Sequence, residues 1–417
     1  MLARGLALFF GGTLLAVIGF GVWNRQNIAK VARNWNELSA GSAIARELHS
    51  PQDMLRYIEQ HPAEVSWVAY DADDEAHGLF LNADRPRVLA GAAHLLVLCA
   101  YAAALERGEL QPNERVAVAD WDKYLLPKTD GAAHELALSQ LRSGKYIDDD
   151  AVQLQDLVFA MMRLSDQAAA DYVMQRVGRA RLEALPALLG LPSIEPPLPF
   201  SGMLLSWEGA IVARAPGAPG APDAGASAAE RIAQLRGMDR QTYADEVWRL
   251  SAALRDDAPR RAAERARLTR QDGLALTLRE QAEFASALSP HASAHDFARL
   301  MAKIEQAELP GSAAIKAELQ WPMQQPELSA RFVSLGTKSG SWPSIIASVT
   351  FARAHGKQAA RVSALFMEDM PMAVWLELMQ GFWHQRVEQA ALGDDAFFGD
   401  ARERLRRAGA AKSPAAP

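Results

Sequence analysis

Strand-like segments lie near both ends of this chain, and helical patterns fill the region between them. Near the amino end, VSWVAYD (Val65–Asp71) and HGLFLN (residues 77–82) are short apolar runs around a polar turn, which predicts a β-hairpin. From Arg331 onward apolar and polar residues alternate, and three further strands are predicted, in RFVSLGTKSG, SIIASVTFARA and ARVSALFME. If the hairpin joins these strands in one sheet, residues 61–395 form an α+β domain into which a helical subdomain is inserted.

The middle of the chain is predicted to be helical. Residues 91–107 are apolar on every side, which is typical of a helix buried all round. The tract ARAPGAPGAPDAGASAA, residues 213–229, predicts a flexible exposed insertion because of its low-complexity Pro/Gly/Ala composition. Residues 371–391 predict one closing amphipathic helix, and residues 396–417 are predicted to form a disordered tail.

The amino-terminal segment predicts a membrane anchor. LALFFGGTLLAVIGFGVW, residues 6–23, contains 18 residues without a charge, close to the roughly 20 that cross a hydrocarbon core. A cleaved signal peptide would have a shorter apolar core with a small-residue cleavage site directly after it, and the run NRQN that follows does not fit. We therefore predict an uncleaved single-span anchor over residues 1–25 and a membrane-proximal helical segment over residues 26–60.

Charge and composition narrow the classes of partner. The formal net charge is −6, and nucleic-acid binding would require a basic face, so no nucleic-acid partner is expected. Cys99 is the single cysteine, which excludes an intrachain disulfide and a cysteine-based metal cluster. His291 and His295 have the i, i+4 spacing of a zinc pair on a helix, but no glutamate lies between them and no third ligand can be named. The sequence predicts neither a metal site nor a cofactor.

Three short motifs follow one another along the chain. AGAAH (residues 90–94) begins the buried helix, SDQ (165–167) lies in a break between two helical runs, and KSGS (338–341) ends a strand. Class A β-lactamases and penicillin-binding proteins carry Ser-x-x-Lys, Ser-Asp-Asn and Lys-Thr-Gly. The second motif differs from theirs by Gln167 for Asn, and the third by Ser339 for Thr. In this order, each in its expected context, the three motifs resemble those of the serine β-lactamase-like family.

The resemblance covers roughly residues 65–379 and implies a fold and a location. The fold would be a five-stranded antiparallel sheet packed by helices, beside an all-helical subdomain, with the active cleft between the two. The phrases WDKYLLPKTDGAAH and ASAHDFARLMAKI also look like those of serine hydrolases in this family. A periplasmic main domain, held by a single-pass anchor in the inner membrane, is a further implication.

The first motif departs from the family pattern at both catalytic positions. The family mechanism acylates a serine that a lysine three residues later deprotonates, because one helical turn brings i and i+3 to the same face. Gly91 stands at the serine position and His94 at the lysine position. Glycine carries no hydroxyl and cannot form an ester, and Ala92 and Ala93 supply none. We expect His94 to be a core histidine or a polar group lining the cleft.

A base for deacylation is also missing from the expected place. Class A members use a glutamate on a loop with an asparagine a few residues on. The corresponding region, GLPSIEPPLPFSG, offers Glu195 followed by two prolines and no such asparagine. Without a base that activates water, any acyl-enzyme would be long-lived.

The binding half of the site is retained. By the resemblance, Ser165 and Lys338 match the positions that pass a proton to the leaving group and hold the substrate carboxylate. The amides of Gly91 and Ser341 match the two oxyanion donors. The expected ligand-binding residues are Asp166, Gln167, Ser339, Gly340 and Ser341.

Three hypotheses of function follow. The first is a membrane-anchored pseudoenzyme that binds a small carboxylate or a peptidoglycan-like ligand in its cleft. The second is an active hydrolase in which Ser165 is the nucleophile and Lys338 or His94 the base. The third is a scaffold without a ligand, in which Gln167 and His94 fill the space between Gly91 and Lys338.

Overall fold

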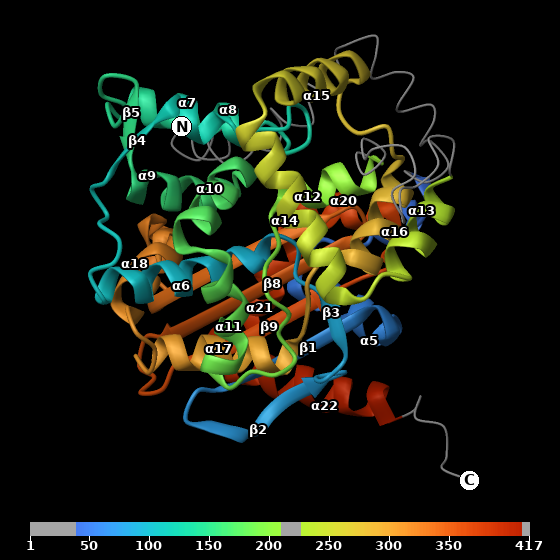
Figure 1. Ribbon diagram of the computed structural model, residues 1–417. Helices are drawn as coiled ribbons and strands as arrows, with labels where there is room; N and C mark the ends of the chain where they lie inside the picture. The colour runs from blue at the N-terminus through green and yellow to red at the C-terminus, as the bar shows by residue number, and fades with distance from the viewer. Residues whose placement is uncertain (1–38, 210–226, 411–417) are drawn as a thin grey trace, which may run out of the picture.

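The computed structural model describes residues 39–209 and 227–410. Its main sheet has the strand order β2-β1-β9-β8-β7, with every neighbouring pair antiparallel (Figure 1). The strands are β1 (Val65–Asp71), β2 (Asp74–Leu81), β7 (Phe332–Trp342), β8 (Ile345–Ala354) and β9 (Arg361–Met367). β1 pairs with β9 along its whole length, from Val65 opposite Met367 to Asp71 opposite Arg361. The predicted union of the first hairpin with the last three strands in one five-stranded sheet is confirmed.

Alternation along the strands divides the core into two layers, one on each face of the sheet. On β1, Trp67 and Ala69 face one layer, whereas Val68 and Tyr70 face the other. The first layer is closed by the helices α5 (Pro51–Gln60), α20 (Met372–Gly381), α21 (Trp383–Gly393) and α22 (Asp395–Ala410). The second is closed by α6 (His94–Glu106) and α17 (Ala294–Glu305). Because side chains of a strand alternate between faces, a strand buried on both faces is largely apolar. In β9, which is buried along its whole length, only Arg361 and Ser363 are polar.

The helices that cover the first face come from both ends of the described chain. They are α4 (Ser42–Ala45), α5 (Pro51–Gln60), η1 (Pro62–Glu64), α20 (Met372–Gly381), α21 (Trp383–Gly393) and α22 (Asp395–Ala410). Ser50 caps α5 by accepting from the Asp53 amide, and Pro51 occupies the first turn. Met54, Leu55 and Ile58 of α5 are fully buried. The folded domain therefore begins before residue 61, the predicted boundary.

The helical subdomain is inserted between β2 and β7, as predicted. Its central helix is α6 (His94–Glu106), with η2 (Ala90–Ala93) directly before it. The elements up to residue 209 are β3 (Pro86–Val88), β4 (Arg115–Ala117), α7 (Val118–Asp122), α8 (Ala133–Ser143), β5 (Ala151–Gln153), α9 (Leu154–Phe159), η3 (Ala160–Leu164), α10 (Gln167–Val177), α11 (Arg179–Leu189) and α12 (Phe200–Trp207). Those after residue 226 are α13 (Ala228–Arg236), α14 (Arg240–Asp256), α15 (Ala258–Gln271), α16 (Leu278–Leu288), β6 (His291–Ser293), α17 (Ala294–Glu305), α18 (Ser312–Leu319), η5 (Trp321–Gln324) and α19 (Pro326–Ser329). Two small pairs, β3 with β6 and β4 with β5, complete it.

The single closing helix predicted over residues 371–391 is wrong. The chain forms α20 and α21, separated at Phe382, whose φ of 52° lies in the left-handed region. A left-handed residue ends a helix, since the ladder of i to i−4 hydrogen bonds cannot continue through it. The break turns α21 so that it packs on β8 and α5.

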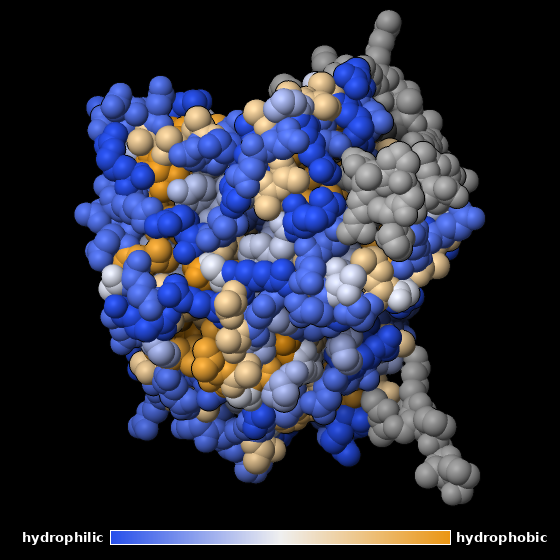
Figure 2. Space-filling view, in the orientation of Figure 1, coloured by the Kyte–Doolittle hydropathy of each residue, from blue (hydrophilic) through white to orange (hydrophobic). Residues whose placement is uncertain are grey.

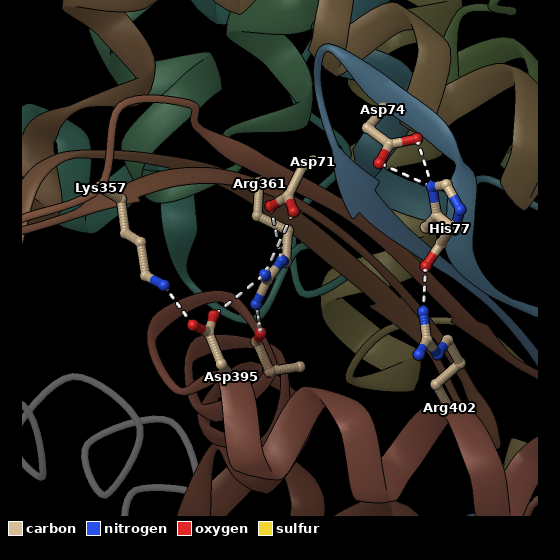
Figure 3. Close-up of polar contacts among 8 residues, drawn as sticks. Asp71, Asp74, His77, Lys357, Arg361, Asp395 and Arg402 are labelled. Atoms are coloured by element: carbon tan, nitrogen blue, oxygen red, sulfur yellow. Dashed lines mark hydrogen bonds and ion pairs between the residues drawn. The ribbon is translucent and has the colours of Figure 1, made fainter.

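The disordered tail predicted over residues 396–417 is also wrong for its described part. α22 lies beside β2 and α5, and it buries Phe397, Phe398, Ala401 and Leu405. Arg361 donates to Asp71 at 2.9 Å and to Asp395 at 3.2 Å, and Lys357 pairs with the same Asp395 (Figure 3). The i, i+4 spacing of the buried residues was the signal for this helix, and composition alone concealed it.

Several predictions fall partly or wholly outside the described residues. The anchor over residues 1–25 and the first part of the membrane-proximal segment lie there, as does most of the insertion predicted over 213–229. The last residues of that insertion are helical instead, because Ser227 caps α13, which begins at Ala228. Among the helices of the described ranges, none has both the length and the apolar character needed to cross a membrane.

Candidate functional site

The first motif lies at the start of α6, against the end of β7. Ala90 precedes Gly91 with a φ of 43°, and Gly91 itself lies in the tight turn η2. A Cβ on Gly340 would lie 2.1 Å from the Gly91 nitrogen and 2.2 Å from its Cα. Gly340 therefore has to be glycine for η2 and β7 to approach this closely. The first and third motifs are brought together as predicted.

Lys338 joins the third motif to the second. Its Nζ donates to Ser165 Oγ at 2.7 Å, to Met162 O at 3.0 Å and to Met161 O at 3.4 Å. The side chain is almost completely buried, and burial lowers the pKa of Lys338 to about 7. Three acceptors match the three donors of an ammonium group, so these contacts favour the charged lysine.

A π-helical turn presents the two methionine carbonyls to Lys338. The turn is η3, and it ends at Ser165, whose φ of 59° is left-handed. Such turns leave main-chain carbonyls outside the regular helical ladder. The serine of the second motif and the carbonyls of η3 are consequently aimed at one ammonium group.

His94 also converges on this turn. Its Nδ1 lies 3.1 Å from Met161 O, and a carbonyl can only accept, so the ring proton is on Nδ1. Burial, together with the charge of Lys338, lowers the pKa of His94 well below its usual value, and the ring is neutral. Its Nε2 is buried and has no hydrogen-bond partner among the described residues. His94 thus carries a free lone pair, but Gly91, one turn earlier, has no hydroxyl that could give it a proton.

Aromatic rings cover this lone histidine. The ring of Phe200 packs edge-on against His94 at 5.1 Å and lies 6.3 Å from Trp342, which contacts Trp207 at 5.2 Å. Asp171 fixes Phe200 in place by accepting from the amides of Phe200 and Ser201 at 2.7 and 2.9 Å. Phe200 lies in the segment GLPSIEPPLPFSG, but no motif in the sequence marks it.

Asp166 of the second motif has a structural role. It caps α10 by accepting from the Ala169 amide, and its other oxygen lies 3.0 Å from His134 Nδ1. His134 Nε2 lies 3.5 Å from Asp122 on its other side. Burial alone lowers the pKa of His134, but the contacts with Asp122 and Asp166 raise it to about 9. The resulting cation ties α8, α7 and the second motif together, a role that the sequence did not reveal although His134 ends one of the family-like phrases.

The remaining predicted ligand residues are spread along the site. Ser339 Oγ accepts from Gln385 Nε2 at 2.9 Å, whereas Gly340 and Ser341 are partly exposed. Gln167 lines a cavity of about 10 Å³ with Tyr124, room for about one water molecule. The scaffold hypothesis predicts that Gln167 and His94 together fill the space between Gly91 and Lys338. In the structure His94 packs against Phe200, and Gln167 lines the small cavity.

Other sequence candidates lie apart from the motifs. Glu195 is held by Arg240 at 2.5 Å and by the His291 amide at 2.9 Å. His291 lies on β6, and α17 begins only at Ala294, so His291 and His295 do not share a helix. His295 contacts Glu75 at 2.5 Å and Asp84 at 3.0 Å. No group of three potential metal ligands occurs within residues 39–209 and 227–410.

The assembled site retains Ser165 and Lys338 but has no hydroxyl at the start of α6 that could be acylated. Ser165 is the hydroxyl nearest the retained lysine. Because its oxygen accepts from Lys338, its own proton is available for an outside acceptor. Ser165 can donate a hydrogen bond to an outside acceptor, and Gly91 has no hydroxyl with which to form an ester.

Comparison with known proteins adds a family and a set of similar folds. The sequence model described as "Beta-lactamase enzyme family" matches residues 51–358. No curated protein matches. A β-lactamase from Sphaerobacter thermophilus is 16% identical, with 81% of this chain and 96% of that chain covered and a TM-score of 0.47. One from Xanthomonas campestris is 10% identical, with 81% and 97% covered and a TM-score of 0.45. PBP-A, solved as an acyl-enzyme complex with penicillin G, is 14% identical, with 82% and 97% covered and a TM-score of 0.46.

Proposed function

This chain belongs to the beta-lactamase enzyme family, and we propose that it is a pseudoenzyme within it, one that binds a ligand but cannot be acylated at the start of α6. The observation that carries this proposal is the backbone of Gly91, which occupies the nucleophile position without a hydroxyl and lies against Gly340. His94, where the family has its lysine, is neutral and lies beneath the ring of Phe200. Neither half of the first motif can therefore perform its step.

The retained groups support a small carboxylate or a peptidoglycan-like peptide as the ligand. Ser165 is partly exposed and can donate its proton outward, because Lys338 already donates to its oxygen. Gly340 and Ser341 follow Lys338 on β7 and are also partly exposed. An ammonium group behind a hydroxyl strengthens that hydroxyl as a donor to an anionic oxygen.

A fluorescent penicillin tests both halves of the proposal. We expect no label on the protein after denaturing electrophoresis, but saturable binding in solution that soluble muropeptides displace. Ser165→Ala should weaken this binding several-fold, whereas Ser143→Ala, on the exposed end of α8, should not change it. A covalent adduct on the wild-type protein would refute the pseudoenzyme, and the absence of reversible binding would refute the ligand.

A second candidate function is hydrolysis with Ser165 as the nucleophile. It is favoured by the 2.7 Å contact between Ser165 and Lys338 and by the pKa of Lys338 near 7, which would supply some neutral amine as a base. Against it, Met161 and Met162 accept from the same nitrogen and stabilise the ammonium form. Turnover of a p-nitrophenyl ester that Ser165→Ala abolishes and Ser143→Ala preserves would establish this activity, and no turnover would eliminate it.

We also propose that residues 1–25 anchor the protein in the inner membrane, with its main domain in the periplasm. The uncharged run over residues 6–23 and the family resemblance support this. A carboxyl-terminal fusion to alkaline phosphatase should be active in cells and remain with the membrane fraction, and a fusion to green fluorescent protein should be dark. The opposite pair of results would place the domain in the cytoplasm.

A further inference from the structure

A second cavity lies on a different part of the molecule from the three motifs. Its volume is about 330 Å³, within the range of sites that hold small molecules. It is formed where β1, the turn before β2, the end of α11 and the helix α17 meet. The lining residues that matter here are Tyr70, Glu75, Leu189, Leu191, Arg299 and Lys303.

Tyr70 supplies an unpaired donor to this cavity. The residue is only 2% exposed, and its Oη is buried without a hydrogen-bond partner in the described part of the chain. Burial raises the pKa of Tyr70, so the phenol stays protonated and keeps a proton to donate. A buried hydroxyl without a partner is unfavourable, because it has lost its hydrogen bonds to water. This points to an acceptor that arrives from outside the chain.

Two cations lie one helical turn apart on α17, at the rim of the cavity. Arg299 pairs with Glu75 through its Nε at 3.5 Å, and Lys303 pairs with Glu308 at 3.5 Å. Both contacts are long, and Glu75 is also engaged with His295 at 2.5 Å. The forked end of the Arg299 guanidinium therefore remains available for a two-oxygen acceptor.

The opposite wall of the cavity is apolar. Leu189 and Leu191 line it, and the adjacent Leu188 is 80% exposed. Figure 2 shows hydrophobic side chains gathered on this face of the molecule, over the region where Figure 1 places α11 and α17. An apolar patch bordered by charged residues is typical of a binding surface.

We propose that this cavity binds a small amphipathic carboxylate, with its apolar group against Leu189 and Leu191 and its carboxylate accepting from Arg299 and Tyr70. A carboxylate fits the planar fork of Arg299 and carries a single charge. A phosphate would carry a larger negative charge toward Glu75 and Glu308, which line the same cavity. The site is separate from Gly91, Ser165 and Lys338 and does not depend on the function proposed for them.

Isothermal titration of the full-length protein with N-acetylleucine and with hexanoate tests this proposal. We expect saturable binding of both acids, no binding of N-acetylleucine amide, and no competition by inorganic phosphate. Binding of the amide with equal affinity would show that the carboxylate is not recognised. Tighter binding of phosphate would overturn the assignment of ligand class, and failure of both acids to bind would overturn the site.

Two variants locate the binding. Arg299→Gln should weaken it at least tenfold, and Tyr70→Phe about fivefold. Removing an unpaired hydroxyl should leave the thermal midpoint of Tyr70→Phe unchanged or higher, which separates lost binding from lost folding. Arg56→Gln is the control, since that arginine is equally exposed and lies on α5. Equal affinity of all three variants would overturn the proposal.

Discussion

The backbones of Gly91 and Gly340 lie in direct contact, and the contact is not symmetric. A Cβ added to Gly340 would lie 2.1 to 2.7 Å from three main-chain atoms of Gly91, whereas a Cβ added to Gly91 would meet Gly340 Cα at 3.1 Å. Main-chain atoms on both sides belong to regular elements and cannot rotate away. The third motif thus has a structural reason for its glycine, whereas a Cβ at Gly91 would require a shift of only a few tenths of an ångström.

Alanine substitution should reveal this asymmetry. Gly340→Ala is expected to lower the free energy of unfolding by ~3 kcal/mol or more, because a strand must move away from η2. Gly91→Ala is expected to change it by no more than ~1 kcal/mol, since only a small adjustment is needed. Urea unfolding followed by circular dichroism measures the free energy of unfolding of both variants. Equal losses would show that η2 and β7 do not approach as described.

Restoring the first motif should restore acylation. In the double variant Gly91→Ser with His94→Lys, we expect slow covalent labelling by fluorescent penicillin, because a Cβ at Gly91 needs only a small shift of Gly340 and a lysine then lies one turn after the serine. The label should persist for hours, since Phe200 rather than a base lies next to position 94. Gly91→Ser alone is the control and should remain unlabelled. No labelling of the folded double variant would show that the remaining groups are not arranged for acyl transfer.

The cation at His134 should make stability depend on pH. The pKa of His134 is raised from 6.5 to about 9, so the stability it contributes is complete below pH 6.5 and is lost as the pH rises through 9. The free-energy difference between wild type and His134→Asn should therefore be roughly 3 kcal/mol larger at pH 6.5 than at pH 9.5. Urea titrations across this range provide the measurement. Ser143→Ala, which changes no titratable group at the exposed end of the same helix α8, is the control and should show a flat difference.

Lys338 should contribute more than Ser165 does to the stability of the contact between β7 and the turn η3. Lys338→Met leaves the carbonyls of Met161 and Met162 without their donor, and a loss of ~2–3 kcal/mol is expected. Ser165→Ala removes a single acceptor and should cost ~1 kcal/mol. Chemical unfolding of the two variants compares them directly. If Lys338→Met were more stable than the wild type, burial of the charge would be more unfavourable than its three hydrogen bonds are favourable.

The last helix should prove integral to the fold. Phe398 on α22 is 8% exposed, and the Arg361 guanidinium lies 4.0 Å from the centre of its ring. Phe398→Ala is expected to cost ~3 kcal/mol, whereas Phe80→Ala, at a phenylalanine that is 40% exposed, should cost less than half as much. Amides of α22 should exchange slowly with deuterium in the wild type. Exchange at the rate of an unfolded peptide would support the original prediction of a disordered tail.

The amino-acid sequence by itself determined the strand architecture and the absence of a hydroxyl at Gly91. Period-two patterns at both ends predicted the five strands, because alternation is a local property of a strand that faces two layers. The order of the three motifs indicated the family, and Gly91 excluded an ester without any coordinates. Composition alone led to the wrong prediction of a disordered carboxyl-terminal tail. The i, i+4 spacing of Phe397, Ala401 and Leu405 indicates the helix that forms there.

Only the tertiary structure decided what surrounds the motifs. His94 meets the carbonyl of Met161, 67 residues away, and Asp166 meets His134 across 32 residues. Such contacts depend on how helices and strands are placed against one another, and no local pattern encodes them. Tertiary structure likewise decides that the Tyr70 hydroxyl has no partner among the residues that the structure describes, because this depends on how α11 and α17 are placed around it.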